Sequence, residues 1–159
     1  MRSATTWGLV SLALLIGLGV YLAPLQPNLV ALQFTFTPAA FTAVLAAWQP
    51  QGVTLFRSHL PVDGFLLLSY AMFGYLLVGN STVFAQFSGA ARQKLALVLP
   101  LAACADAAEN LLHWWLTAPD ASAAAWIYTL AGACASLKWL CLVAFAAMVA
   151  WAWLQRRSA

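Results

Sequence analysis

Charged residues are scarce in this sequence. Of its 159 residues, 4 are Asp or Glu and 7 are Lys or Arg, so that only 7% of the chain is charged. A soluble protein of average composition carries about 25% charged residues, many of which cover its surface. The shortage excludes a soluble enzyme, a disordered chain and a nucleic-acid-binding protein.

Cysteine is scarce as well, and the sequence contains no clear internal repeat or low-complexity tract. The 3 cysteines are Cys104, Cys134 and Cys141, and no two of them form a C-x-x-C pair. All of them fall inside apolar stretches, where free cysteine acts as a small apolar side chain. We interpret them as such, and a thiol metal site or a disulfide is the less favoured alternative.

Apolar residues are abundant instead, at 64% of the chain, with a mean hydropathy of +0.86. A membrane-spanning helix takes about 20 mostly apolar residues, and runs such as LVSLALLIGLGV lack the alternation of transmembrane β-strands. The sequence predicts an all-α integral membrane four-helix bundle, a single transmembrane domain over residues 1–159. The spans are expected at about 7–23, 61–79, 93–116 and 122–154. The last is longer than a bilayer requires and should tilt or project.

Positive charges predict the orientation of these spans. Arg2 precedes an apolar core that has features of a signal peptide, but the core is long for one, so we expect an uncleaved helix. With four spans, one side of the membrane carries only Arg57 together with Asp120. Positively charged loops stay in the cytoplasm, so both termini are predicted to be cytoplasmic, in a bacterial inner membrane. The residues that mark the cytoplasmic side are Arg2, Arg92, Lys94, Arg156 and Arg157.

The long loop before the second span contains a predicted short helix at about 38–49. Thr37 and Pro38 are typical of a helix start. Phe41, Val44 and Trp48 then recur at helical spacing. Two interpretations are open: an amphipathic helix on the outer membrane surface, or a helix that packs over the bundle.

The third span carries a polar stripe, which is the most specific signal in the sequence. Asp106, Glu109, Asn110 and His113 are spaced i, i+3, i+4 and i+7, so they share one face of a helix. Ionisable residues inside a bilayer are rare and usually face a partner or a cavity. The stripe predicts either a functional pocket or a buried polar seam that holds helices together.

Helix register brings Lys138 to this stripe. The third and fourth spans are antiparallel and joined by a short link, so Lys138 should lie near the level of Asp106. The two side chains lean toward each other, since each points toward the start of its own helix. We predict a direct or water-bridged ion pair near the middle of the membrane.

The second span is expected to add further polar residues. Aligned in the same way, Asp63 faces Glu109 and His59 faces His113, with Arg57 nearby. Tyr70 lies two turns deeper on the face of Asp63, where its hydroxyl can donate a hydrogen bond into the same space. These residues would gather in the outer part of the bundle.

Two prolines should shape the helices around this region. Pro61 is expected to set the angle at which the second span enters the membrane. Pro100 frees a backbone carbonyl and should kink the third span below the site.

Several chemistries fit this set of residues. Histidine and carboxylate side chains bind Zn, Mn or Fe, although the H-E-x-x-H motif and the paired E-x-x-H helices of di-iron bundles are absent. The candidate metal ligands are His59, Asp63, Glu109 and His113. In an enzyme, Asp63, Asp106 and Glu109 would act as general acids and bases. The sequence identifies no cofactor. The candidates for binding a small molecule or lipid are Asp63, Tyr70, Asp106, Glu109, Asn110 and Lys138.

The stretch from Gln33 to Tyr70, with its F-T pairs and R-S-H-L-P-V-D, and the D-A-A-E-N motif at 106–110 resemble a family of small uncharacterised bacterial four-span membrane proteins. In that family a surface segment precedes an Asp-to-Tyr second span, and D-x-x-E-N lies in the third. The resemblance covers spans two and three and the loop before them, and it implies no known activity. A looser similarity, in architecture alone, is to EXPERA-type four-helix membrane proteins, whose intramembrane carboxylates bind amine-like or sterol-like ligands.

Three functions follow as alternatives. The first is an outward-facing intramembrane polar pocket that binds a small ligand, a lipid or a metal. The second is an accessory or assembly subunit of a membrane complex, in which the polar seam and Lys138 are purely structural. The third is a membrane-embedded enzyme that modifies a lipid or isoprenoid. The first predicts a cavity at the seam, whereas the second predicts tight packing with every charge paired. Transport would require a homo-oligomer to enclose a path.

Overall fold

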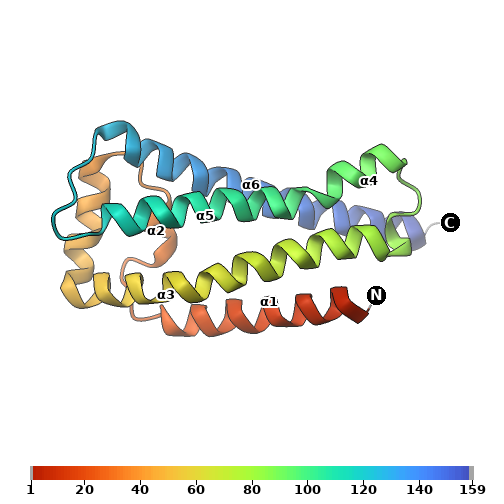
Figure 1. Cartoon of the computed structure of the whole chain (residues 1–159), viewed down its shortest axis with the longest axis horizontal. Helices are drawn as coiled ribbons and strands as arrows, with labels where there is room; N and C mark the ends of the chain where they lie inside the picture. Colours follow the sequence, from red (N-terminus) through yellow and green to blue (C-terminus); the bar gives the residue numbers. More distant parts are fainter. Residues whose placement is uncertain (1, 158–159) are drawn as a thin grey trace.

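The structure, a computed structural model, describes residues 2–157, with the side chains of 156 and 157 left out. Every regular element in this range is helical, which confirms the all-α prediction (Figure 1). Four segments are long and apolar enough to cross a membrane, so the chain is a multi-pass membrane protein. The elements are α1 (Arg2–Tyr21), α2 (Leu29–Gln33), α3 (Pro38–Asn80), η1 (Thr82–Phe84), α4 (Gly89–Ala96), α5 (Val98–Leu116) and α6 (Ala125–Arg157).

α3 consists of two helices that meet at Gln49. This residue has φ 59° and ψ 170°, outside the helical region. The α conformation is disfavoured before a proline, and Pro50 follows directly. The helix that contains the second span therefore begins at Pro50, well before position 61, where the span was predicted to start. Pro61 lies inside the continuous helix, so the prediction that it sets the entry angle is wrong.

The first part of α3, residues 38–48, packs over one end of the bundle. Thr37 caps it, since the Thr37 hydroxyl accepts a hydrogen bond from the Ala40 amide, as predicted. Phe41, Val44 and Trp48 are buried in one apolar cluster with residues of the later helices. Figure 1 shows this segment, in orange, lying across the end of the bundle. Of the two interpretations left open by the sequence, the helix packed over the bundle is the one observed.

The third span is interrupted at Leu97, between α4 and α5. Pro100 lacks a backbone N–H, so the carbonyl of Ala96 loses its helical partner. The break lies on the side of the polar stripe that the sequence predicted. The fourth span, α6, begins at Ala125, three residues later than predicted, and at 33 residues it is as long as expected.

The helices differ in how firmly they are packed. α5 packs along both α6 and α3, whereas α1 packs chiefly along α3. Ala4 is the only buried residue of α1. Both ends of the described chain lie at the same end of the bundle (Figure 1), as an even number of spans requires. The topology markers Arg156 and Arg157 fall outside the described side chains.

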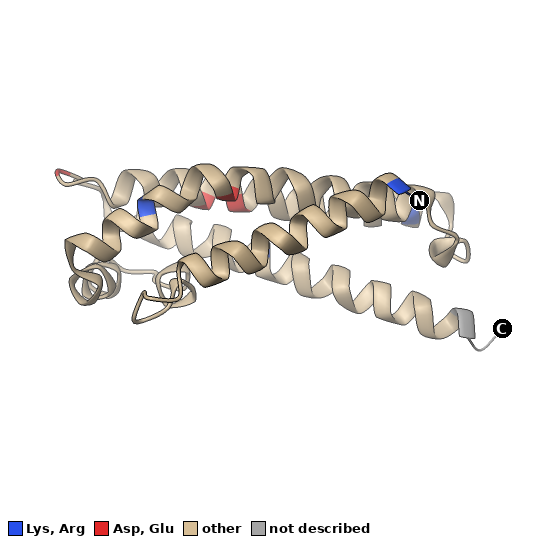
Figure 2. Cartoon of the chain, turned by 90° about the horizontal axis from the view of Figure 1, so that it is seen from below, with Lys and Arg blue, Asp and Glu red and all other residues tan. Residues whose placement is uncertain are grey.

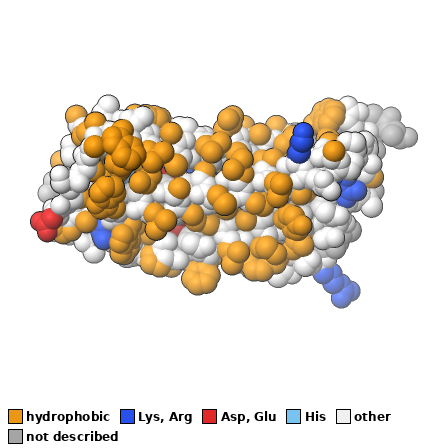
Figure 3. Space-filling model, turned by 45° about the horizontal axis from the view of Figure 1, so that its top comes forward, with side chains coloured by type: hydrophobic (Ala, Val, Ile, Leu, Met, Phe, Trp, Pro, Cys, Tyr) orange, Lys and Arg blue, Asp and Glu red, His pale blue; other side chains and the backbone are white. Residues whose placement is uncertain are grey.

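Two apolar clusters fill the two ends of the bundle. One contains Phe41, Trp48 and Phe56, and the other contains Val78, Phe84 and Phe145. The face in Figure 3 is largely apolar along its middle, and most charged side chains visible there lie toward the ends. Figure 2 shows acidic positions in the middle of the bundle instead. The polar stripe thus lies between two apolar regions.

Candidate functional site

The centre of the site is a buried lysine between two carboxyl groups. Lys138 Nζ from α6 lies 3.0 Å from Asp106 Oδ1 and 2.7 Å from Glu109 Oε2, both on α5. All three residues are buried, and Glu109 is 0% exposed. The predicted ion pair between Lys138 and Asp106 is confirmed. The contact between Lys138 and Glu109 was not predicted, because Glu109 was expected to face Asp63. Inside a bilayer such pairing is what makes charged side chains tolerable.

Two residues of α3 complete the polar arrangement. The Tyr70 hydroxyl donates a hydrogen bond to Asp106 Oδ2 at 3.2 Å, as the register predicted. Asp63 accepts a hydrogen bond from Asn110 Nδ2 through its Oδ2 atom, at 2.6 Å. Asp63 therefore meets the residue next to Glu109 rather than Glu109 itself, a difference of one position in register. Three carboxyl groups gather around a single ammonium.

The two histidines lie toward the end of the bundle that residues 38–48 cover, which we call the capped end. His113 Nδ1 is 3.6 Å from Glu109 Oε1, and His113 Nε2 is buried without a hydrogen-bond partner. His59 Nδ1 contacts the Phe56 carbonyl of its own helix. The Phe56 ring packs against both imidazoles. His59 and His113 thus share a neighbourhood, as predicted, with an aromatic ring as their common contact.

No group of three His, Cys, Asp or Glu side chains within residues 2–157 is placed to hold a metal ion. His59 and His113 both border Phe56, while Glu109 is engaged by Lys138 and Asp63 by Asn110. The geometry gives the metal interpretation no support.

Arg57 lies outside the polar cluster. Its guanidinium donates hydrogen bonds to the Trp114 carbonyl at 2.6 Å and to Thr117 Oγ1 at 2.8 Å. It also lies 4.3 Å from the centre of the Trp114 ring. Arg57, which was expected near these residues, is bonded at the end of α5 instead, because the Trp114 carbonyl, the Thr117 hydroxyl and the indole ring hold its positive charge there.

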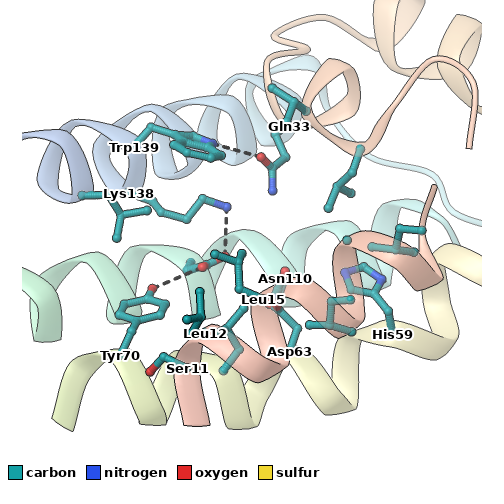
Figure 4. A pocket seen from close by; sticks show the side chains of 18 of the residues that line it. Ser11, Leu12, Leu15, Gln33, His59, Asp63, Tyr70, Asn110, Lys138 and Trp139 are labelled. Atoms are coloured by element: carbon teal, nitrogen blue, oxygen red, sulfur yellow. Dashed lines mark hydrogen bonds and ion pairs between the residues drawn. The ribbon is translucent and has the colours of Figure 1, made fainter. Parts of the chain in front are cut away.

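A cavity of about 940 Å³ adjoins the polar cluster. The six candidate ligand-binding residues line it, as do His59 and His113. Figure 4 shows Asp63, Tyr70, Asn110 and Lys138 around this space, together with the α1 side chains Ser11, Leu12 and Leu15. This cluster of polar residues is therefore not a tightly packed seam, because it forms one wall of an open space. The other walls are mostly apolar and come from α1, α2 and α6.

Three polar residues of the cavity wall were missed in the sequence. Ser11 on α1 donates a hydrogen bond to Ser69 Oγ at 2.9 Å. Trp139 Nε1 donates to Gln33 Oε1 at 3.0 Å, which ties α6 to α2 (Figure 4). Ser11 is a lone polar residue in an apolar span, and Gln33, now in α2, lies in what the sequence predicted to be a loop. Neither residue therefore belonged to a polar pattern with helical spacing. The one sequence signal that could have indicated these residues was the position of Trp139 directly after Lys138, next to the predicted ion pair.

Comparison with known proteins gives no family: no family model, no curated protein and no solved structure matches the chain. The resemblance to the D-x-x-E-N four-span family therefore stays a prediction. What the fold and the site define is a multi-pass helical membrane protein with a cavity beside a buried charged cluster.

Proposed function

We propose that this protein binds a small ligand or lipid in the cavity beside Lys138. The observation that carries the proposal is the cavity itself, about 940 Å³ in volume and bordered by buried charges. Ligand pockets combine mostly apolar walls with a few convergent polar groups, and they measure about 300–1,000 Å³. A seam that only joined helices would have no reason to leave such a space.

The polar residues divide into two roles in this proposal. Lys138, Asp106 and Tyr70 are bonded to one another and hold the wall in place. Asp63 is only partly buried, and it lines the cavity from α3. Asp63 and the neighbouring Asn110 are therefore the residues that recognise the ligand. Glu109 connects the two groups, since it pairs with Lys138 and also lines the cavity.

A structural subunit of a larger membrane complex is the second candidate. The contact that favours it is the bridge from Lys138 to Asp106 and Glu109, which joins α6 to α5 directly. In that case the cluster would be needed for stability alone, and no molecule would occupy the cavity.

We further propose that the protein lies in a bacterial inner membrane with both termini in the cytoplasm. Arg2 stands at the start of α1, while Arg92 and Lys94 stand on α4 between the second and third spans. The Arg92 side chain donates hydrogen bonds to the carbonyls of Val78 and Gly79. The positive charges supporting this orientation are thus at the end of the bundle that carries the N-terminus.

Native mass spectrometry of the protein taken from the membrane in polymer-bounded discs, without detergent, tests the binding proposal. We expect the unmodified protein to retain a bound molecule, and Asp63→Asn and Glu109→Gln to lose most of it while circular dichroism still reports a folded helical protein. Asp120→Asn, in the loop before α6, is the matched control and should retain the molecule. Binding is refuted if the unmodified protein carries nothing, or if Asp63→Asn and Glu109→Gln retain as much as the control.

A further inference from the structure

The cavity opens sideways, toward the lipid. Several residues line the cavity and are also exposed: Leu12 and Leu15 of α1 are 52% and 59% exposed, and Trp139 of α6 is 38% exposed. They therefore form the rim of its mouth. Leu12 and Trp139 lie near the middle of their helices, so the mouth faces the hydrocarbon region of the membrane. α1 and α6 are not extensively packed against each other, which leaves the passage between them open.

The end of the bundle nearest the charges is covered instead. Phe41, Trp48 and Phe56 belong to the apolar cluster at that end. The Phe41 ring packs against the His113 ring, with 5.7 Å between the two ring centres. α2 adds Gln33, which lines the cavity beneath this cover. A water-soluble ligand would have to displace these residues, whereas a molecule dissolved in the membrane would not.

The polar wall offers hydrogen-bond acceptors. Glu109 Oε1 and His113 Nε2 are buried and have no hydrogen-bond partner, and both residues line the cavity. His113 is 1% exposed. When His113 Nδ1 carries the proton that faces Glu109, His113 Nε2 is an acceptor. Buried polar atoms without partners are rare in folded proteins, so a ligand that donates hydrogen bonds would satisfy them.

The charges also select against an anion. The Lys138 ammonium, the one cation among the cavity-lining residues described, is already engaged by Asp106 and Glu109. Asp63 adds a third carboxyl group to the same space. An anionic head would meet three carboxyl groups and no free counter-charge, and a carboxylate at close range repels it strongly in a medium of low polarity.

We propose that the ligand is a membrane-dissolved amphiphile that enters between α1 and α6, with a hydrogen-bond-donating head that is not anionic. The head lies against Asp63, Glu109 and His113. The apolar tail lies along Leu66, Phe73, Leu99, Leu142 and Phe145, which line the part of the cavity away from the capped end. This inference rests on the proposed binding function and adds to it the class of ligand and the route of entry.

Two glycines of α1 allow the route to be tested. Gly19 lines the cavity, and a Cβ atom at this position would meet no other atom within 4 Å. Gly17 has equally open surroundings but does not line the cavity. Gly19→Trp should therefore fill the mouth, and Gly17→Trp should extend into lipid. Both substitutions place the same apolar side chain on an exposed position of α1, so Gly17→Trp controls for any effect on folding.

Three amphiphiles with the same tail test the head. Native mass spectrometry in nanodiscs would measure binding of lauryl alcohol, laurylamine and laurate. We expect the alcohol or the amine to bind at least about tenfold more tightly than laurate, and Gly19→Trp to weaken that binding by a similar factor. Gly17→Trp should bind as the unmodified protein does. The relative affinities of the alcohol and the amine distinguish a neutral head from a cationic one.

The outcomes separate this inference from the proposed function. If laurate binds as tightly as the other two, or if Gly19→Trp binds as well as Gly17→Trp, the inference is wrong. The binding function would still stand if the unmodified protein retained a molecule that Asp63→Asn lost. If no probe binds and no molecule is retained, both proposals fail together.

Discussion

Lys138 is an unusual residue to find in the middle of an apolar span. A charged side chain at the centre of a bilayer costs about 2.5–3.5 kcal/mol on insertion scales. Here Lys138 Nζ has two carboxyl partners, at 3.0 and 2.7 Å. Each partner in turn has another polar neighbour, Tyr70 for Asp106 and His113 for Glu109. The cost of each charge is therefore offset by the others, and the removal of one would expose the rest.

Lys138→Met tests this dependence. The substitution keeps an apolar stem of similar length but leaves two buried carboxyl groups without their cation, so we expect the protein to lose about 3 kcal/mol of stability. Thermal unfolding followed by circular dichroism would show the lower midpoint. Lys94→Met, at an exposed position of α4, should leave the midpoint within a degree or two of the original. Equal midpoints for the two variants would contradict a structural role of Lys138.

The sequence predicted the centre of the site well at this scale. Lys138 and Asp106 could be paired because the link between their helices is short and the helices are antiparallel, so that a count of residues gives their relative depth. The partners of Arg57 were not predicted, since depth alone does not reveal that a carbonyl and an indole ring bind its guanidinium. Gln33 was missed because the short helix α2 was not predicted, and a residue assigned to a loop has no helical register from which its position can be deduced.

At the scale of the helices, the approach of α3 to α5 depends on Gly74. A Cβ atom at this position would lie 2.6–2.8 Å from three side-chain atoms of Leu99, including its Cβ. Small residues permit such close helix contacts in membrane proteins. The contact lies one turn below Tyr70, and it holds α3 at the distance from which the Tyr70 hydroxyl reaches Asp106.

Gly74→Ala should therefore destabilise the protein, by about 1–3 kcal/mol, because Leu99 or the helix itself must move. Gly64→Ala is the control, as a side chain at Gly64 would meet nothing within 4 Å. In a helix interior, alanine is favoured over glycine by about 0.8–1.0 kcal/mol, so Gly64→Ala should be neutral or stabilising. Denaturant unfolding of both variants would measure the difference. A stabilised Gly74→Ala would mean that the two helices can separate freely.

The helices themselves were more predictable than their boundaries. Apolar runs located all four spans, and Thr37 with Pro38 located the start of the helix over the bundle end. The start of this helix at Pro50 was not predicted, because the apolar run of the second span starts at Pro61 and polar residues precede it in the sequence. In the structure the helix continues through Pro61, whereas the sharp change of direction is made at Gln49. Whether a helix bends at one proline or at another depends on how the segments on either side pack, and this packing cannot be deduced from the sequence.

At the scale of the whole molecule, the two ends of the described chain lie on the same side of the bundle. The proposed orientation places that side in the cytoplasm. A green fluorescent protein fused to the C-terminus should then fluoresce, and alkaline phosphatase fused at the same position should be inactive. Alkaline phosphatase inserted after Asp120, between the third and fourth spans, should be active. The reverse pattern of activities would contradict the orientation.

The sideways mouth of the cavity has a practical consequence for anyone who purifies the protein. Detergents are themselves amphiphiles with single apolar tails, and the rim formed by Leu12, Leu15 and Trp139 lies at the level where a micelle covers the protein. A detergent molecule can enter by the same passage and replace a native occupant during extraction. Samples taken from the membrane in a polymer-bounded disc, with their own lipids around them, should therefore contain molecules that detergent-purified samples have lost.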